Sequence, residues 1–319
     1  MVSPLVSICM PAYNAGLYIT ESINSVINQT YKNWELIIVN DGSTDNTSTQ
    51  LEKLQDDRIK IYHQENKGQC AAANKAFYLS KGELIKFMDA DDLISPDFIK
   101  NQVEVIAGNE TTIASASWGR FYNNDLNTFR LVSDNIKTDR APIDWLVESM
   151  TEKQVMLQCA LWLIPRSILT SSGLWNEDLS LINDFEFFIR VFLKAEKISY
   201  TSNAILYYRS GLNQSLSGLK SKKGAESAYK SINLGVKHML DYENSPRIRS
   251  LAANHFQHFV YDFYPSHIDV VSKAEQKIKE FGGSTILYAS RGYTKILTQI
   301  IGWKACKKIK HTLSAFKND

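Results

Sequence analysis

The sequence predicts an α/β protein in which a mostly parallel sheet is flanked by helices and followed by a helical C-terminal region. In the first hundred residues, short apolar runs typical of buried strands alternate with segments of helical spacing. Each apolar run stops at a cluster of polar or turn-forming residues. From about residue 218 onward, only helical spacing remains. We therefore expect one domain over residues 1–217 and a helical extension over residues 218–319.

The composition is that of an ordinary soluble globular protein, with 44% hydrophobic and 22% charged residues. A net charge of +2 gives no general reason to expect a nucleic-acid partner. The four cysteines lack Cys-x-x-Cys spacing, which argues against a zinc site or a disulfide framework and indicates a reducing compartment. No signal peptide and no apolar run of about 18–20 residues is present, so we expect a cytoplasmic protein.

Apolar periodicity and turn residues place the elements of the first hundred residues. Strands are expected over residues 5–10, 34–39, 58–62 and 83–87. Helices are expected over residues 17–28 and 66–79, with a helix between them that Ser43 or Thr44 would cap. Strands that alternate with helices imply right-handed crossovers and a largely parallel sheet. The loops that follow the strands should therefore meet at one edge of the sheet.

The stretch over residues 83–92 is the most informative, because an apolar run ends there in three carboxylates: Asp89, Asp91 and Asp92. In an extended chain, Asp89 and Asp91 would point to the same side. Carboxylates this close repel each other, and a divalent cation with oxygen ligands is the usual relief. The stretch therefore predicts a site for a metal and a diphosphate. The alternative is a solvated acidic turn in which Asp92 caps the next helix.

The other loops at this edge contain the groups that a nucleotide needs. Residues 11–14, Asp41 and residues 66–69 offer carboxylates and amides to a base and a ribose. No Gly-x-Gly-x-x-Gly follows the first strand, which argues against a dinucleotide-binding domain. No Gly-x-x-x-x-Gly-Lys-[Ser/Thr] is present either, so a P-loop NTPase is excluded.

The order and spacing of several motifs resemble family 2 glycosyltransferases. These motifs are VSICMPAYN from residue 6, VNDGSTD from residue 39, NKG from residue 66, AAN from residue 72 and DADD from residue 89. The resemblance covers about the first two thirds of the chain and implies the GT-A fold, a Rossmann-like mostly parallel sheet. It also implies inverting transfer of a sugar from a metal-bound nucleotide-sugar, with a UDP-sugar favoured, to an acceptor hydroxyl. The process would be glycan or cell-envelope polysaccharide biosynthesis.

The resemblance implies roles for individual residues. Asp41 would contact the base, often uracil, and Asp89 the ribose. Asp91 would bind the Mn²⁺ or Mg²⁺ that holds the diphosphate. The full set expected to bind the donor is Pro11, Tyr13, Asn14, Asp41, Lys67, Gln69, Asp89, Ala90 and Arg209.

Asp184 is the expected general base, because it maps onto the family's catalytic Asp at the head of a helix. A carboxylate within about 3 Å of the acceptor hydroxyl can take its proton as that oxygen attacks the anomeric carbon. The helix dipole helps to keep such a carboxylate ionised. The alternative is that Asp184 only caps the helix. Glu186 is a local rival, but it lies about 200° around the helix from Asp184.

Three positions depart from the family pattern. Ala73 stands where many relatives carry Arg, Asn183 replaces a Glu, and Gly211 replaces a His that completes the metal shell. Nearby basic groups such as Lys67 and Arg209 would then face the donor, and Ser215 and Ser217 would close over it.

The departures leave two rivals open. The first is a non-catalytic nucleotide-sugar-binding or scaffold protein. The second is a nucleotidyltransferase, which would require a basic Gly-rich loop after the first strand. Residues 11–16 contain no Arg or Lys.

The middle third should add strands over residues 112–118, 129–132, 157–164 and 204–209, and helices over residues 142–150 and 166–172. Trp118 and Trp175 are candidates for an acceptor pocket, although both are equally consistent with a core. The acceptor would be a glycan, a lipid-linked glycan or a protein.

The last hundred residues should form helices over residues 225–240 and 246–264. His255 and His258 are three apart, but no Glu-x-x-His or Cys pattern supports a metal site. Residues 286–316 interleave apolar residues with lysines. This pattern indicates either an amphipathic helix in peripheral contact with the inner face of a membrane or a helix packed on the catalytic domain.

Overall fold

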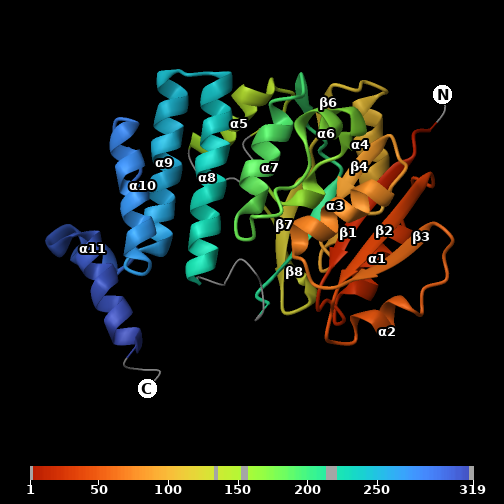
Figure 1. The fold of residues 1–319 in the computed structure, drawn as a ribbon, viewed down its shortest axis with the longest axis horizontal. Coiled ribbons are helices and arrows are strands. Elements are labelled where there is room, and N and C mark those ends of the chain that lie inside the picture. Colours follow the sequence, from red (N-terminus) through yellow and green to blue (C-terminus); the bar gives the residue numbers. More distant parts are fainter. Residues whose placement is uncertain (1–2, 133–135, 152–156, 213–220, 316–319) are drawn as a thin grey trace. The chain divides into compact units, whose positions relative to one another are not determined.

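The computed structural model describes residues 3–132, 136–151, 157–212 and 221–315. The chain separates into two compact units, Met1–Leu216 and Ser217–Asp319. Strands and helices both occur in the first unit, whereas the described part of the second contains only helices (Figure 1).

The main sheet of the first unit has five strands in the order β3-β2-β1-β4-β9. The first four run parallel, and β9 pairs antiparallel with β4. Apolar residues fill β1, β2 and β4 almost without alternation, as expected for parallel strands that are covered on both faces. The predicted α/β fold is therefore confirmed. The strands are β1 (Val6–Ala12), β2 (Trp34–Asp41), β3 (Ile59–Gln64), β4 (Leu84–Phe87) and β9 (Ile164–Pro165).

Four helices connect or follow these strands: α1 (Ile19–Ile27), α2 (Thr47–Leu51), α3 (Gln69–Leu79) and α4 (Phe98–Ile106). The alanines of α3, including Ala72 and Ala76, are buried. Their small side chains allow α3 to pack closely on β1 and β2. This packing places Gln69, the first residue of α3, at the edge where the strands end.

A second sheet has the order β5-β11-β7-β8, and β6 pairs with β10 in a third. β5 comes directly after the acidic residues, so its pairing with β11 brings Arg209 next to them. The strands are β5 (Leu93–Ile94), β6 (Thr112–Ala114), β7 (Ser117–Tyr122), β8 (Asp125–Leu131), β10 (Lys197–Ser199) and β11 (Ile205–Ser210). The remaining helices are α5 (Pro142–Thr151), the 3₁₀ turn η1 (Cys159–Leu161), α6 (Arg166–Ser172) and α7 (Asn183–Phe192).

Three local expectations are wrong. Residues 157–164 are not one strand, because the Gln158 side chain accepts a hydrogen bond from the Ala160 N–H and starts η1 instead. Neither Ser43 nor Thr44 caps α2, since the Asp45 carboxylate accepts the Thr47 N–H at 2.9 Å. Asp92 does not cap α4, which begins at Phe98.

The second unit contains α8 (Lys222–Tyr242), α9 (Pro246–Phe263), α10 (Ile268–Glu280) and α11 (Tyr293–Ala315). The sequence patterns did not predict α10. Buried apolar residues such as Met239, Phe256 and Phe259 form the core in which α9 packs against α8 and α10. α11 is kinked at Gly302, whose φ of 78° is not helical. Within the described ranges, no helix is both long and apolar enough to cross a bilayer.

Candidate active site

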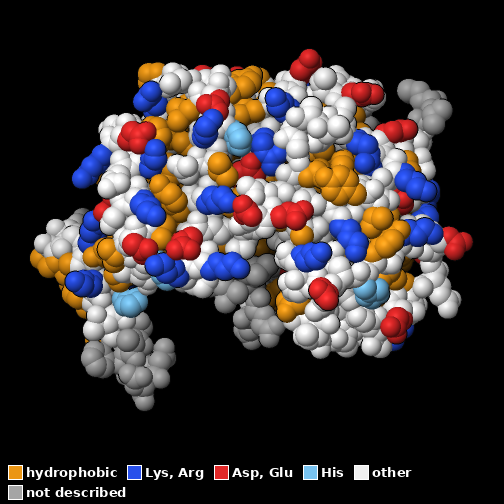
Figure 2. Space-filling view, viewed as in Figure 1, with side chains coloured by type: hydrophobic (Ala, Val, Ile, Leu, Met, Phe, Trp, Pro, Cys, Tyr) orange, Lys and Arg blue, Asp and Glu red, His pale blue; other side chains and the backbone are white. Residues whose placement is uncertain are grey.

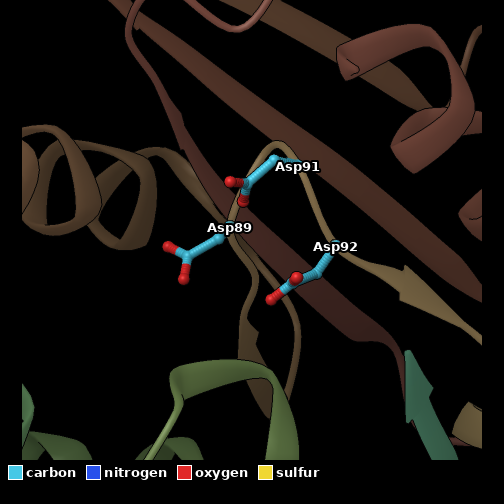
Figure 3. A group of neighbouring side chains, drawn as sticks. All are labelled: Asp89, Asp91 and Asp92. Carbon is cyan, nitrogen blue, oxygen red and sulfur yellow. The ribbon is translucent and has the colours of Figure 1, made fainter. Parts of the chain in front are cut away.

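Asp89, Asp91 and Asp92 form an acid cluster on the turn between β4 and β5 (Figure 3). One carboxylate oxygen from each lies within 4.8 Å of the others. β4 ends at Phe87, so the turn and not an extended strand brings these side chains together. The predicted cluster therefore forms, but the strand-parity reason given for it is wrong.

The three carboxylates differ in their hydrogen bonds. Asp92 is buried, and its two oxygens accept from Arg209 N at 2.8 Å and from Gln158 Nε2 at 2.6 Å. Asp89 accepts from Gln69 Nε2 at 2.8 Å and from Gln158 Nε2 at 3.1 Å. Among the described residues, no side chain donates a hydrogen bond to the Asp91 carboxylate, although its own backbone N–H does. Asp91 therefore has the most free acceptor capacity in the cluster.

The cluster concentrates negative charge at a site where Asp92 is buried and Asp89 and Asp91 are half-buried. Burial raises the pKa of Asp91 to about 7, and the neighbouring Asp89 adds to the rise. Burial also raises the pKa of Asp92 well above its usual range, with Asp91 and Asp89 as further causes. A hard divalent cation prefers this kind of oxygen donor set, so the residues fit Mg²⁺ or Mn²⁺.

Arg209 supports the acidic turn. Its side chain is fully buried, its Nε donates to the Asp91 carbonyl at 2.7 Å, and its Nη2 donates to Glu21 at 2.8 Å. Its guanidinium lies 4.7 Å from the ring centroids of Tyr18 and of Phe121. Its Nη1 is buried without a hydrogen-bond partner among the described residues, so one end of the guanidinium keeps unused donor capacity.

Asp41 organises the loop that leads into α3. One of its carboxylate oxygens accepts from Gln64 Nε2 at 2.7 Å and from Lys67 N at 2.9 Å, and the other accepts from Gly68 N at 2.8 Å. Gly42, at φ 71°, follows Asp41, and a Cβ there would lie 2.8 Å from the Asn66 N. Only glycine therefore allows the two loops to approach this closely.

The loop after β1 is tied to the loop after β2. Asn14 donates its N–H to Ser43 Oγ at 3.0 Å, and its Oδ1 accepts the Thr44 N–H at 2.8 Å. Tyr13 beside it is 52% exposed, so its ring is available to a ligand. Pro11 lines a small crevice beside the acid cluster, while Ala90 is buried in the acidic turn. The residues that line the crevice are Pro11, Gln69, Cys70, Ala73, Phe87, Asp89, Cys159 and Trp175.

Asp184 lies at the start of α7, which hydrogen bonds join to the acid cluster. Asn183 Nδ2 donates to Gln69 Oε1 at 3.3 Å, and Gln69 in turn donates to Asp89. Asp184 is half-buried. Burial raises its pKa to about 6, and the charge of Asp89 adds to the rise while the Phe185 N–H opposes it. At the position where many relatives carry a charged Glu, Asn183 thus forms a neutral hydrogen bond that links α7 to α3.

Glu186 and the two tryptophans are held by structural contacts. Glu186 is buried and pairs with Arg190 Nε at 2.6 Å. The Trp175 ring stacks on Phe187 with centroids 3.8 Å apart, although it also lines the crevice. Trp118 is buried and contacts the Tyr208 ring edge-on.

Two departures have a visible local consequence. Ala73 lies in the wall of the crevice, where a larger side chain would fill the space. Gly211 follows β11 at φ 81°. Ser215 and Ser217 lie outside the described residues.

Sequence reasoning missed Gln158 and Glu21. Gln158 had a visible signal, since it is the one amide side chain in the apolar run from residue 157 to 164. Glu21 had none, because only the fold brings α1 next to Arg209.

Residues 7–160 match the family model described as Glycosyl transferase family 2. Glycosyltransferase GlyG of Streptococcus pneumoniae is 28% identical over 223 residues, which cover 65% of this chain and 71% of GlyG. An uncharacterized glycosyltransferase of Rickettsia conorii is 34% identical over 194 residues, or 59% of this chain. The matched part spans only 31% of that longer protein.

The fold is also that of a solved structure. S. aureus TarS 1–349, crystallised with UDP-GlcNAc, superimposes with a TM-score of 0.62 at 17% identity, over 87% of this chain and 88% of TarS. Its complex with UDP gives the same TM-score. The parallel sheet, with carboxylates where its strands end, thus defines a glycosyltransferase of the GT-A fold. Residues 7–160 are thus similar to the glycosyl transferase family 2 domain, and the relatives that match this part of the chain are glycosyltransferases.

Proposed function

We propose that this enzyme transfers a sugar from a nucleotide-sugar, most favourably a UDP-sugar, to an acceptor hydroxyl with inversion, in glycan or cell-envelope polysaccharide biosynthesis. One observation carries the proposal. The acid cluster contains a carboxylate with free acceptor capacity, Asp91. Hydrogen bonds through Gln69 and Asn183 join the cluster to α7, whose first turn carries Asp184. The TarS structures in complex with UDP and UDP-GlcNAc support the choice of donor.

The acid cluster is the proposed metal site. Asp91 would hold Mn²⁺ or Mg²⁺, with diphosphate oxygens and water as further ligands. When bound, the cation would stabilise the negative charge that grows on the departing diphosphate. Asp89 would remain oriented by Gln69 and Gln158 to contact the ribose.

The loops at the sheet edge form the proposed donor site. Asp41 holds the loop from residue 66 to 68 against β2 and would contact the base through its remaining acceptor capacity. Arg209 supports the acidic turn, and its Nη1, which has no hydrogen-bond partner among the described residues, is the atom through which it would contact a donor phosphate. The other residues proposed to line the donor site directly are Pro11, Tyr13, Asn14, Lys67, Gln69, Asp89 and Ala90.

Asp184 is the proposed general base. A pKa of about 6 leaves it ionised at neutral pH, yet basic enough to accept a proton from the acceptor hydroxyl. The deprotonated oxygen would attack the anomeric carbon from the side opposite the diphosphate, which inverts the configuration. Trp118 and Trp175 would contact the acceptor only along their limited exposed edges.

We assign transfer to residues 1–217 and propose a separate role for the helical region over residues 218–319. Five apolar residues of α11 lie exposed on one face of its first half, and the whole helix carries five lysines and no acidic residue. This combination favours peripheral contact with the anionic cytoplasmic face of a membrane, where a lipid-linked acceptor would be found.

A donor screen tests the proposed function. Purified protein is incubated with Mn²⁺ or Mg²⁺ and UDP-, GDP- or dTDP-sugars, and release of the nucleotide is measured. We expect metal-dependent release from one donor and its loss in Asp91→Ala. If no donor is turned over and calorimetry detects no nucleotide binding, the proposal is wrong, and a scaffold without a donor site is favoured instead.

A further inference from the structure

Gln158 lies between two of the three carboxylates of the acid cluster. Its Nε2 donates to Asp92 Oδ2 at 2.6 Å and to Asp89 Oδ2 at 3.1 Å. A side-chain NH₂ group carries two hydrogens, so one amide can serve both acceptors at once. The side chain is buried, which shields both hydrogen bonds from competition with water.

The orientation of this amide is set by the backbone. Gln158 is the N-cap of η1, and its Oε1 accepts the Ala160 N–H at 2.6 Å. A flipped amide would point its oxygen at two carboxylates and its NH₂ at a donor. The amide therefore has one stable orientation, with its donors facing the acid cluster.

The turn that carries Gln158 is itself anchored by two buried side chains. Lys86 of β4 donates from Nζ to the carbonyl oxygens of Ala160 and Trp162. Gln102 of α4 donates from Nε2 to the carbonyl oxygen of Leu161 at 2.9 Å. Lys86 and Gln102 are fully buried. Gln158 is thus held against the sheet that also carries the acidic turn.

Neutral donors also occupy the other oxygens of the two carboxylates. Gln69 binds Asp89 Oδ1, and Arg209 N binds Asp92 Oδ1. An amide between two carboxylates orients both without adding a positive charge that would compete with a cation. Asp91 is left as the carboxylate with the most free acceptor capacity, as a metal ligand must be.

We infer that Gln158 is a positioning residue that holds Asp89 and Asp92 in place beside Asp91 and thereby sets the affinity of the acid cluster for its divalent cation. This inference rests on the proposed metal site. Hydrogen-bond partners of ligating groups typically change metal affinity by about 10- to 100-fold when they are removed. Gln158 touches no part of the sugar in this role.

The test compares two buried glutamines of the first unit. Gln158→Met keeps the length of the side chain but removes its donors. Gln29→Met does the same to a fully buried glutamine whose hydrogen bonds go to backbone groups of Ser25, Ser95 and Ile99. Binding of Mn²⁺ to the purified full chain is measured by electron paramagnetic resonance, with and without UDP, and scaled to the folded fraction from circular dichroism. We expect Gln158→Met to weaken Mn²⁺ binding about 10-fold or more. Gln29→Met should melt at a lower temperature and bind Mn²⁺ as the wild type does.

The outcomes separate the inference from the proposed function. Wild-type Mn²⁺ affinity in Gln158→Met, or an equal loss in both variants, would overturn the role of the amide and leave the metal site intact. A wild-type chain that binds no Mn²⁺ would overturn both. If Gln158→Met does not fold, Gln158→Asn replaces it, since its amide is one methylene too short to reach both carboxylates. Unchanged Mn²⁺ affinity in that variant would overturn the inference as well.

Discussion

Asp184 and Glu186 are two acids of one helix that have different surroundings. Asp184 is half-buried at the N-terminus of α7, and a hydrogen-bond chain through Asn183 and Gln69 joins its neighbourhood to the acid cluster. Glu186 is buried and pairs with Arg190. Asp184 is therefore available for proton transfer, whereas Glu186 is a structural residue.

Replacement of the proposed base should abolish transfer without unfolding the protein. We expect Asp184→Asn to lower the transfer rate by about 100-fold or more, because the amide cannot accept the acceptor's proton. Binding of the donor nucleotide should remain close to that of the wild type. The measurements are product formation with the donor found in the screen and calorimetry with its nucleotide.

The matched control is Glu186→Gln on the same helix. It weakens a buried ion pair, so the melting temperature should fall while the activity per folded molecule is kept. If Asp184→Asn instead behaves like this control, with lower stability and wild-type activity, the residue is a helix cap and another group acts as the base.

Among individual elements, α3 connects the two sides of the site. Its first residue, Gln69, reaches both Asp89 and Asn183. Further along, Asn74 Nδ2 donates to the Trp175 carbonyl at 2.9 Å, and the Trp175 N–H donates to Asn74 Oδ1 at 3.0 Å. The helix thus fixes the segment that leads into α7 relative to the acid cluster.

α11 presents an apolar face that the described residues leave exposed. The first half of the helix places five apolar side chains within about 140° of arc. In the second half, Trp303 packs between Tyr261 and Tyr288, so this part is held by its own unit. Figure 2 shows hydrophobic side chains together with lysine or arginine where Figure 1 draws α11. The exposed residues are Tyr293, Ile296, Leu297, Ile300 and Ile301.

Negative charge introduced on this face of α11 should weaken membrane binding. We expect the wild type to sediment with vesicles that contain phosphatidylglycerol. The affinity of the double variant Ile296→Glu/Ile300→Glu for these vesicles should be lower by about 10-fold or more, because two apolar side chains can no longer enter the interface. Cosedimentation measures both.

Tyr242→Glu is the control, because it changes an exposed apolar residue of α8 in the same unit. It should bind vesicles as the wild type does. Equal binding by the wild type and the α11 variant would refute membrane contact through this face.

At the scale of the whole molecule, the buried acids should make folding stability depend on pH and metal. The folded pKa values of Asp91, about 7, and Asp184, about 6, lie above the usual value of 3.8. Between about pH 4 and 7 the folded protein therefore binds more protons than the unfolded chain does. The stabilisation from these groups is complete below pH 4 and is lost as the pH rises toward 7.

Thermal unfolding in EDTA should accordingly show a higher melting temperature at pH 5 than at pH 7.5. Addition of Mn²⁺ at pH 7.5 should raise it again, because a cation replaces the protons. In Asp91→Ala, both the pH effect and the response to Mn²⁺ should shrink. A wild-type protein that melts at the same temperature at both pH values in EDTA would contradict the raised pKa values.

The sequence alone was sufficient for the parallel sheet, most of its helices and the presence of an acidic cluster after β4. These features depend on local periodicity and on the rule that ligands bind where parallel strands end. The sequence pattern did not predict the structure of residues 157–164, because there a hydrogen bond between a side chain and the backbone competes with extended structure. It also failed to show that Arg209 is buried, because that depends on the pairing of β11 with β5 and β7.

The sequence by itself determined the class of this protein, because the order of the motifs and the apolar runs can be recognised without knowing the conformation of the loops. Only the tertiary structure decided which acid is free and which are anchored. Asp89, Asp91 and Asp92 look alike in the sequence, and the partners that distinguish them come from residues 69, 158 and 209. Such contacts join residues far apart in the chain, so no local pattern records them, and they exist only once the chain has folded.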